Sequence, residues 1–135
     1  MSASGEIELA PFGAEMTAIA IGGAIGACLR FAVSLLIGAT HLHSALAAGG
    51  ANIIGSFLLG LIVGHLESGK AHPLLRPFLT VGVFGSFTTF SALMVGVVES
   101  AHDGLTLAGA GYGLTSVVVG LGAAAVGMGL AKAAR

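Results

Sequence analysis

Three observations predict an all-α membrane protein with four transmembrane helices, the third of them broken at its midpoint. First, 56% of the 135 residues are hydrophobic and only 8% are charged, whereas soluble domains carry about 25% charged residues. Second, the apolar residues gather in four segments, each with the roughly 20 residues that a helix needs to cross a bilayer. Third, glycines, hydroxyls and phenylalanines interrupt the third segment. We therefore expect a single four-helix transmembrane domain over residues 1–135, with the lipid bilayer as its solvent.

The four predicted spans are separated by short polar connectors. They cover about residues 15–37, 45–66, 74–98 and 105–131. Glutamates, with no Lys or Arg, precede the first span, so a retained helix is favoured over a signal peptide, which needs a basic region. Pro73 and Pro77 suit the start of the third span. Small-xxx-small pairs such as Gly60 and Gly64 predict helices that approach closely in lipid.

The interruption of the third span runs from Gly82 to Ser91, with the sequence GVFGSFTTFS. Non-helical backbone at membrane depth is tolerated only where protein or a wet cavity satisfies its polar groups. Gly-interrupted spans mark the places where transporters and channels handle their ions. Ser86 and Ser91 have no basic partner in the sequence, so a nucleophile is not expected. This pattern predicts a permeation site, and no enzyme.

Composition also bears on other partners. The single cysteine, Cys28, excludes an internal disulfide and a cysteine metal cluster. The net charge of −1 argues against binding of nucleic acid. His41 and His43 form only a weak metal-binding pattern, and interfacial histidines are the safer interpretation.

Polar side chains inside the predicted spans are candidates for function, because they are costly in lipid. Arg30, Asn52 and Tyr112 each lie seven residues from the same membrane face, which is a depth of roughly 10 Å at 1.5 Å per residue. Ser116 lies one turn deeper, on the same helix face as Tyr112. Together with the threonine pair of the interruption, these side chains predict a descending track of hydrogen-bond donors.

The donors indicate the sign of the ion. Arginine offers only donors, the asparagine amide offers two, and hydroxyls can turn to donate. No Asp or Glu lies deep in a span, although a cation pathway normally has carboxylates or a carbonyl filter. The positive ring edges of Phe84, Phe87 and Phe90 are suited to contact a small anion. We therefore predict an anion pathway.

Simpler interpretations stay open for each polar residue. Arg30 is equally compatible with snorkelling to the interface. Asn52 fits an interhelical hydrogen-bond clip, and Tyr112 fits an interfacial aromatic belt. Ser116 fits a hydroxyl that bonds back to its own helix.

The distribution of Lys and Arg predicts the orientation in the cell membrane. With four spans, the N-terminus, the second connector and the C-terminus share one side. That side holds Lys70, Arg76, Lys132 and Arg135, and the opposite connectors hold no Lys or Arg. A multi-pass protein with both termini in the cytoplasm is expected.

Four features together resemble the Fluc (CrcB) fluoride channel family. They are the segment GGAIGACLRF at 22–31, the segment NIIGSFLLG at 52–60, the interruption at 82–91, and the size of four short spans. The resemblance covers nearly all of the chain from Gly22 to about Ser116. It implies a fluoride-selective channel subunit that exports fluoride passively and lowers its cytoplasmic concentration. It also implies an antiparallel, inverted dimer with two fluoride pathways at its interface.

The resemblance implies roles for particular residues as well. A sodium ion that is not transported would be held by the backbone carbonyls of Gly85 and Thr88, and carbonyl oxygens suit a hard cation. The candidate fluoride pathway comprises Asn52, Phe90, Ser91, Tyr112, Ser116 and Arg30.

The chain departs from the family pattern just after the interruption. Family members usually continue as Thr-Thr-Phe-Ser-Thr-Phe, whereas Ala92 and Leu93 stand at the last two positions here. Gly96 replaces a family glutamate. Leu93 has no ring edge to offer an anion. The departures leave open whether one pathway is lost or one ring contact in each pathway.

The charge bias bears on the partner. An inverted homodimer needs subunits that insert in both orientations, and the one-sided Lys and Arg disfavour this. We expect pairing with an oppositely oriented homologous subunit, with a homodimer as the alternative. Other functional hypotheses are a small multidrug-type four-helix transporter, which generally needs a buried carboxylate, and a non-conducting membrane subunit of a heterodimer.

Overall fold

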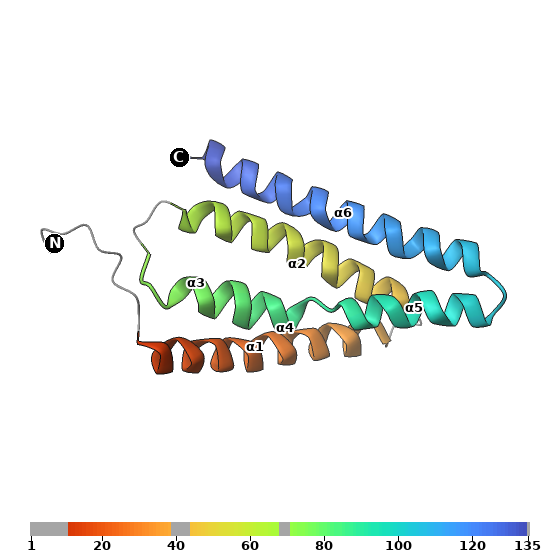
Figure 1. Cartoon of the computed structure of the whole chain (residues 1–135), viewed down its shortest axis with the longest axis horizontal. Coiled ribbons are helices and arrows are strands. Elements are labelled where there is room, and N and C mark those ends of the chain that lie inside the picture. Colours follow the sequence, from red (N-terminus) through yellow and green to blue (C-terminus); the bar gives the residue numbers. More distant parts are fainter. Residues whose placement is uncertain (1–10, 39–43, 68–70, 135) are drawn as a thin grey trace, which may run out of the picture.

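The computed structural model describes residues 11–38, 44–67 and 71–134, which form helices joined by short turns. Within these residues, four helical spans are long and apolar enough to cross a membrane, as predicted. The helices are α1 (Phe12–Gly38), α2 (Ser44–Leu66), α3 (Leu75–Pro77), η1 (Phe78–Phe84), α4 (Gly85–Phe87), α5 (Phe90–His102) and α6 (Thr106–Ala133). Figure 1 shows the four spans side by side, with the start of α1 and the end of α6 at the same end of the bundle.

The boundaries of the spans agree with the prediction within a few residues. α1 begins at Phe12, earlier than the predicted start near residue 15, because Pro11 accepts the first backbone bonds of the helix. The third span continues to His102 instead of ending near residue 98. The preference for apolar residues sets the length of a span, but turn and cap bonds set its ends.

The third span is broken where the sequence predicted it. A π-helical stretch, η1, leads into the single turn of α4, and Thr88 and Thr89 then adopt extended backbone with ψ of 152° and 115°. Both threonines are β-branched, which lowers their preference for a helix. Thr89 also serves as the N-cap of α5, because its Oγ1 accepts a hydrogen bond from the Ala92 N–H.

Glycines determine how closely the helices pack. α1 packs mainly against η1, and α2 packs mainly against α6. A Cβ on Gly26 would collide with the carbonyl oxygen of Val83, and one on Gly60 would collide with that of Ala124. Backbone therefore lies directly against backbone, as expected where small residues rather than hydrophobic burial hold helices together in lipid.

The surface of the single chain is largely apolar. Among the described residues, the buried hydrophobic side chains are few: Ala51, Val83, Phe84, Leu93 and Ala131. Many Leu, Ile, Val and Phe side chains are exposed along all four spans, which suits contact with lipid or with another membrane subunit.

Candidate functional site

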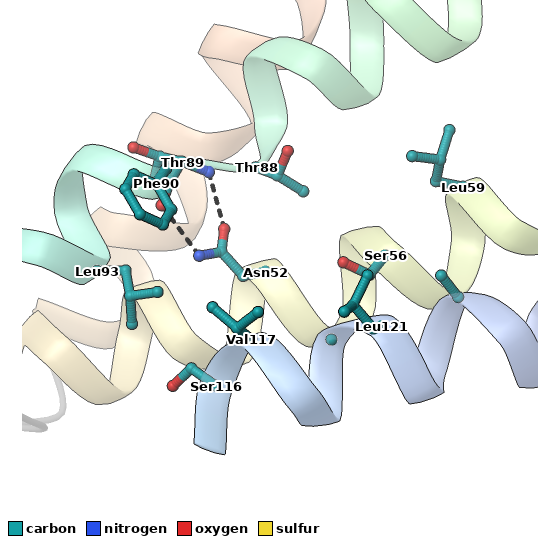
Figure 2. Close-up of a pocket in the computed structure, with 12 residues that line it drawn as sticks. Asn52, Ser56, Leu59, Thr88, Thr89, Phe90, Leu93, Ser116, Val117 and Leu121 are labelled. Atoms are coloured by element: carbon teal, nitrogen blue, oxygen red, sulfur yellow. Dashed lines mark hydrogen bonds between the residues drawn. The ribbon is translucent and has the colours of Figure 1, made fainter. Parts of the chain in front are cut away.

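A groove of about 340 Å³ lies where the broken third span faces α2 and α6. Figure 2 shows its lining, with the threonine pair and Phe90 on one side and α2 and α6 on the other. The lining residues are Asn52, Ser56, Leu59, Thr88, Thr89, Phe90, Leu93, Ser116, Val117, Gly120, Leu121 and Ala124. These lining residues are mostly apolar, with a few amide and hydroxyl groups, and none of them carries a carboxylate.

Asn52 joins α2 to the break through two hydrogen bonds with the backbone of Thr89. The Asn52 Nδ2 donates to the Thr89 carbonyl oxygen at 3.0 Å, and the Thr89 N–H donates to Asn52 Oδ1 at 2.8 Å. The amide is therefore an interhelical clip, which was one of the open interpretations. Because one of its two donor hydrogens is used, a single N–H remains for an ion in the groove.

The two threonine hydroxyls offer less than the sequence suggested. Thr88 Oγ1 donates its proton to the Phe84 carbonyl at 2.8 Å. Thr89 Oγ1 accepts from the Ala92 N–H at 3.3 Å and shares a hydrogen bond with Ser91 Oγ at 3.0 Å. Thr88 has no proton left to donate, and the Thr89–Ser91 pair keeps one. The prediction of a continuous track of donors through the threonines is therefore wrong for Thr88.

The phenylalanines of the break do not act as a group. Phe90 is 66% exposed and lines the groove, so its ring edge is accessible. Phe84 is buried, and the ring of Phe87 packs against the backbone of Gly55. The expectation that all three rings contact an anion is therefore wrong for Phe84. Phe87 is half-buried, and a contact of its ring with an anion stays a prediction. Leu93 is only 3% exposed and forms part of the groove wall.

Two serines, Ser116 and Ser56, line the groove. Among the described residues, the Ser116 hydroxyl has no hydrogen-bond partner, so the interpretation that it bonds back to its own helix is wrong. Ser56 also lines the groove, and the sequence analysis missed it. It follows Asn52 by four residues, and this spacing places the two side chains on the same helix face.

The structure separates Tyr112 and Arg30 from the groove. The Tyr112 hydroxyl packs next to Gly49, where an added Cβ would lie 3.3 Å from it. Arg30 is half-buried on α1, and no α1 residue lines the groove. Asn52, Phe90 and Ser116 thus meet in one place, with Ser91 bonded to its edge. The participation of Tyr112 and Arg30 in a pathway stays a prediction.

Comparison with known proteins places these features in a family. Residues 17–128 match the model of the family described as CrcB-like protein, Camphor Resistance (CrcB). A relative from Idiomarina loihiensis, named fluoride-specific ion channel FluC, is 43% identical over 68% of this chain and 72% of its own length. A relative of that name from Mesorhizobium japonicum is 35% identical, over 74% of this chain and 82% of its own length. One from Thermobifida fusca, named fluoride-specific ion channel FluC 2, is 43% identical over 63% of this chain and 64% of its own length. The chain belongs to the CrcB-like family.

Proposed function

We propose that this chain is a subunit of a fluoride-selective channel that lets fluoride leave the cell down its gradient. The observation that carries the proposal is the groove at the broken third span, where free donors and a ring edge stand in apolar walls. The choice of fluoride over other anions is supported by the names of the relatives. None of the described lining residues carries a carboxylate or another charge, so they suit a small anion better than a cation.

Fluoride would move between weak contacts instead of settling in one strong site. The remaining N–H of Asn52 and the hydroxyl of Ser116 donate to the ion, and the edge of the Phe90 ring presents its positive rim. None of these groups is charged, so each can replace part of the hydration shell of the ion without binding it tightly. This balance allows an ion both to enter and to leave.

A structural sodium ion fits the backbone of the break. Gly85 is exposed, and Thr88 lies in extended backbone, so their carbonyls are not enclosed within a continuous helix. Uncharged carbonyl oxygens are suitable ligands for a hard cation. When bound, such an ion would supply fixed positive charge next to the groove. One subunit contributes two carbonyls, so a second subunit would complete the coordination.

The partner we propose is an oppositely oriented homologous subunit, in an inverted dimer. The one-sided Lys and Arg support this choice, and so does the burial of Leu93, which gives the pathway no second ring. Relatives from Thermobifida fusca and Bacillus subtilis carry the numbered name FluC 2, which accords with paired subunits. A homologous partner with a phenylalanine at that position would supply the missing ring.

A small multidrug-type transporter is the competing function. That mechanism generally needs a buried carboxylate for cationic substrates, and among the described residues none lines the groove. A non-conducting membrane subunit is the other alternative, and it predicts that replacing Phe90 has no effect on fluoride flux.

The test is fluoride efflux from liposomes, measured with a fluoride electrode and with chloride as the control. The purified chain is reconstituted alone and together with a homologous second subunit from the same organism. Fast, fluoride-selective efflux in the second case only is the expected result. Efflux from the chain alone would retain the channel and refute the need for a partner, and silence in both cases would refute the channel.

A further inference from the structure

We propose that Asn52 is a positioning residue that holds the third span open and thereby releases the Gly85 carbonyl to bind a cation. The inference rests on the cation site of the proposed function and deepens it. It assigns to α2 a part in that site, although no α2 residue is a ligand in it.

The first step concerns the hydrogen-bond pattern of the backbone. In an α-helix, the N–H of residue 89 would bond to the carbonyl of residue 85. The Thr88 N–H follows this pattern and donates to the Phe84 carbonyl at 3.0 Å. The Thr89 N–H instead donates to Asn52 Oδ1 at 2.8 Å. The N–H that would bond to the Gly85 carbonyl in a helix is therefore bonded to a side chain instead.

The second step concerns the cost of the extended backbone. Unpaired backbone groups at membrane depth cost several kcal/mol each, and open backbone there must be satisfied by protein. Asn52 satisfies both the N–H and the carbonyl of Thr89, as a neighbouring strand would. It carries the only side-chain amide in the sequence, which has no other Asn and no Gln. No other side chain in the sequence carries an amide N–H and a carbonyl oxygen on one planar group, as a peptide unit does.

The third step concerns the fit of α2 against the break. Gly55 lies one turn beyond Asn52, and a Cβ there would come within 2.7 Å of Thr88 Cγ2 and 3.0 Å of Phe87 Cδ1. The absence of a side chain at Gly55 brings the break close enough for the Asn52 amide to reach Thr89. Asn52 and Gly55 together form the surface of α2 against which the break packs.

Two substitutions separate a positioning role from a role in lining the pathway. In Asn52→Leu, the volume is similar but both hydrogen bonds are lost, so the Thr89 N–H is free to return to Gly85. In Asn52→Asp, the acceptor for the Thr89 N–H is kept. Phe90→Ile is the matched control, because it changes the groove and leaves the hydrogen bonds of Asn52 intact.

The readout is the midpoint sodium concentration at which the thermal unfolding temperature rises, measured on the purified complex in detergent against N-methylglucamine chloride. We expect the wild type and Phe90→Ile to share one midpoint within about threefold. Asn52→Asp should need no more sodium than these, because it keeps the acceptor for the Thr89 N–H and its negative charge attracts the cation. Asn52→Leu should need at least tenfold more sodium.

Three results would overturn the inference: a wild-type midpoint in Asn52→Leu, equal losses in Asn52→Asp and Asn52→Leu, or a wild-type protein indifferent to sodium. If Asn52→Leu does not fold, Asn52→Ala takes its place with the same expected and overturning results, because it removes the same two hydrogen bonds with a smaller side chain. Fluoride efflux is recorded in parallel. A complex that shows the expected sodium pattern without conducting fluoride keeps the inference and refutes the proposed channel.

Discussion

Phe90 is the residue whose environment differs most from that of the other phenylalanines in the break. Phe84 is buried and Phe87 is half-buried, whereas the Phe90 ring is 66% exposed beside the groove. An aromatic ring that stays exposed at the edge of a helix break contributes little to the folding stability of the single subunit. An exposed position of this kind suits the proposed contact with an ion, as well as contact with a second subunit or with lipid.

We predict that Phe90→Ile lowers fluoride efflux at least tenfold without reducing the amount of folded protein. Isoleucine keeps the apolar volume but has no positive ring edge. Phe31→Ile is the matched control, because Phe31 is 65% exposed on α1, away from the groove. Equal efflux from the two variants, measured in liposomes with a fluoride electrode, would show that the ring has no part in permeation.

Ser116 provides a second prediction at this scale. Its hydroxyl is free to donate, and hydrogen bonds to charged groups are worth about 1.5–3 kcal/mol. Ser116→Ala should therefore reduce fluoride conductance about tenfold. Ser34→Ala serves as the control, because the Ser34 hydroxyl is already bonded to the Arg30 carbonyl at 3.0 Å. Single-channel recording in planar bilayers checks both, and an unchanged conductance in Ser116→Ala contradicts the assignment.

At the scale of the elements, the packing of α1 against η1 depends on a few glycines. The π-helical stretch is seven residues long and lies directly before the break, and such stretches often occur at functional sites. The close approach of α1 keeps this stretch in place. Changes at the glycines of α1 are thus expected to act on the break from a distance.

Gly26→Ala is predicted to destabilise the subunit by about 1–3 kcal/mol, the usual cost of overpacking. Its new methyl group would collide with the Val83 carbonyl of η1. Gly111→Ala is the control, because nothing lies within 4 Å of a Cβ at Gly111. Thermal unfolding in detergent measures the difference, and a Gly26→Ala protein as stable as Gly111→Ala would mean that the two helices pack less closely than described.

Some features of the elements can be predicted from the sequence alone, and others cannot. Apolar length predicted four spans, and the run of Gly, Ser and Thr predicted the break, because both are local properties of the chain. The pairing of Asn52 with Thr89 joins residues 37 positions apart, and no local pattern indicates which backbone group an amide will select. The burial of Phe84 and the separation of Tyr112 from the groove also depend on helix rotation, which a nearly uniform apolar surface leaves undetermined.

At the scale of the whole molecule, the orientation in the membrane decides how the subunit assembles. A C-terminal green fluorescent protein fusion should fluoresce and a C-terminal alkaline phosphatase fusion should be inactive, because we expect the one-sided Lys and Arg to keep that end in the cytoplasm. Moving two lysines into the first connector should reverse both signals. Comparable activity of both fusions in the unmodified chain would show insertion in two orientations and favour the homodimer.

The lining of the groove has one further consequence, which concerns acidity. The side chains that surround it are amides, hydroxyls, aliphatic chains and one phenyl ring, so none of the described lining residues gains or loses a proton near neutral pH. Fluoride enters cells as its uncharged acid, and the rate of entry is highest when the medium is acidic. A pathway lined by groups that do not titrate would conduct fluoride equally well when the medium acidifies. Export would therefore continue under the conditions in which fluoride entry is fastest.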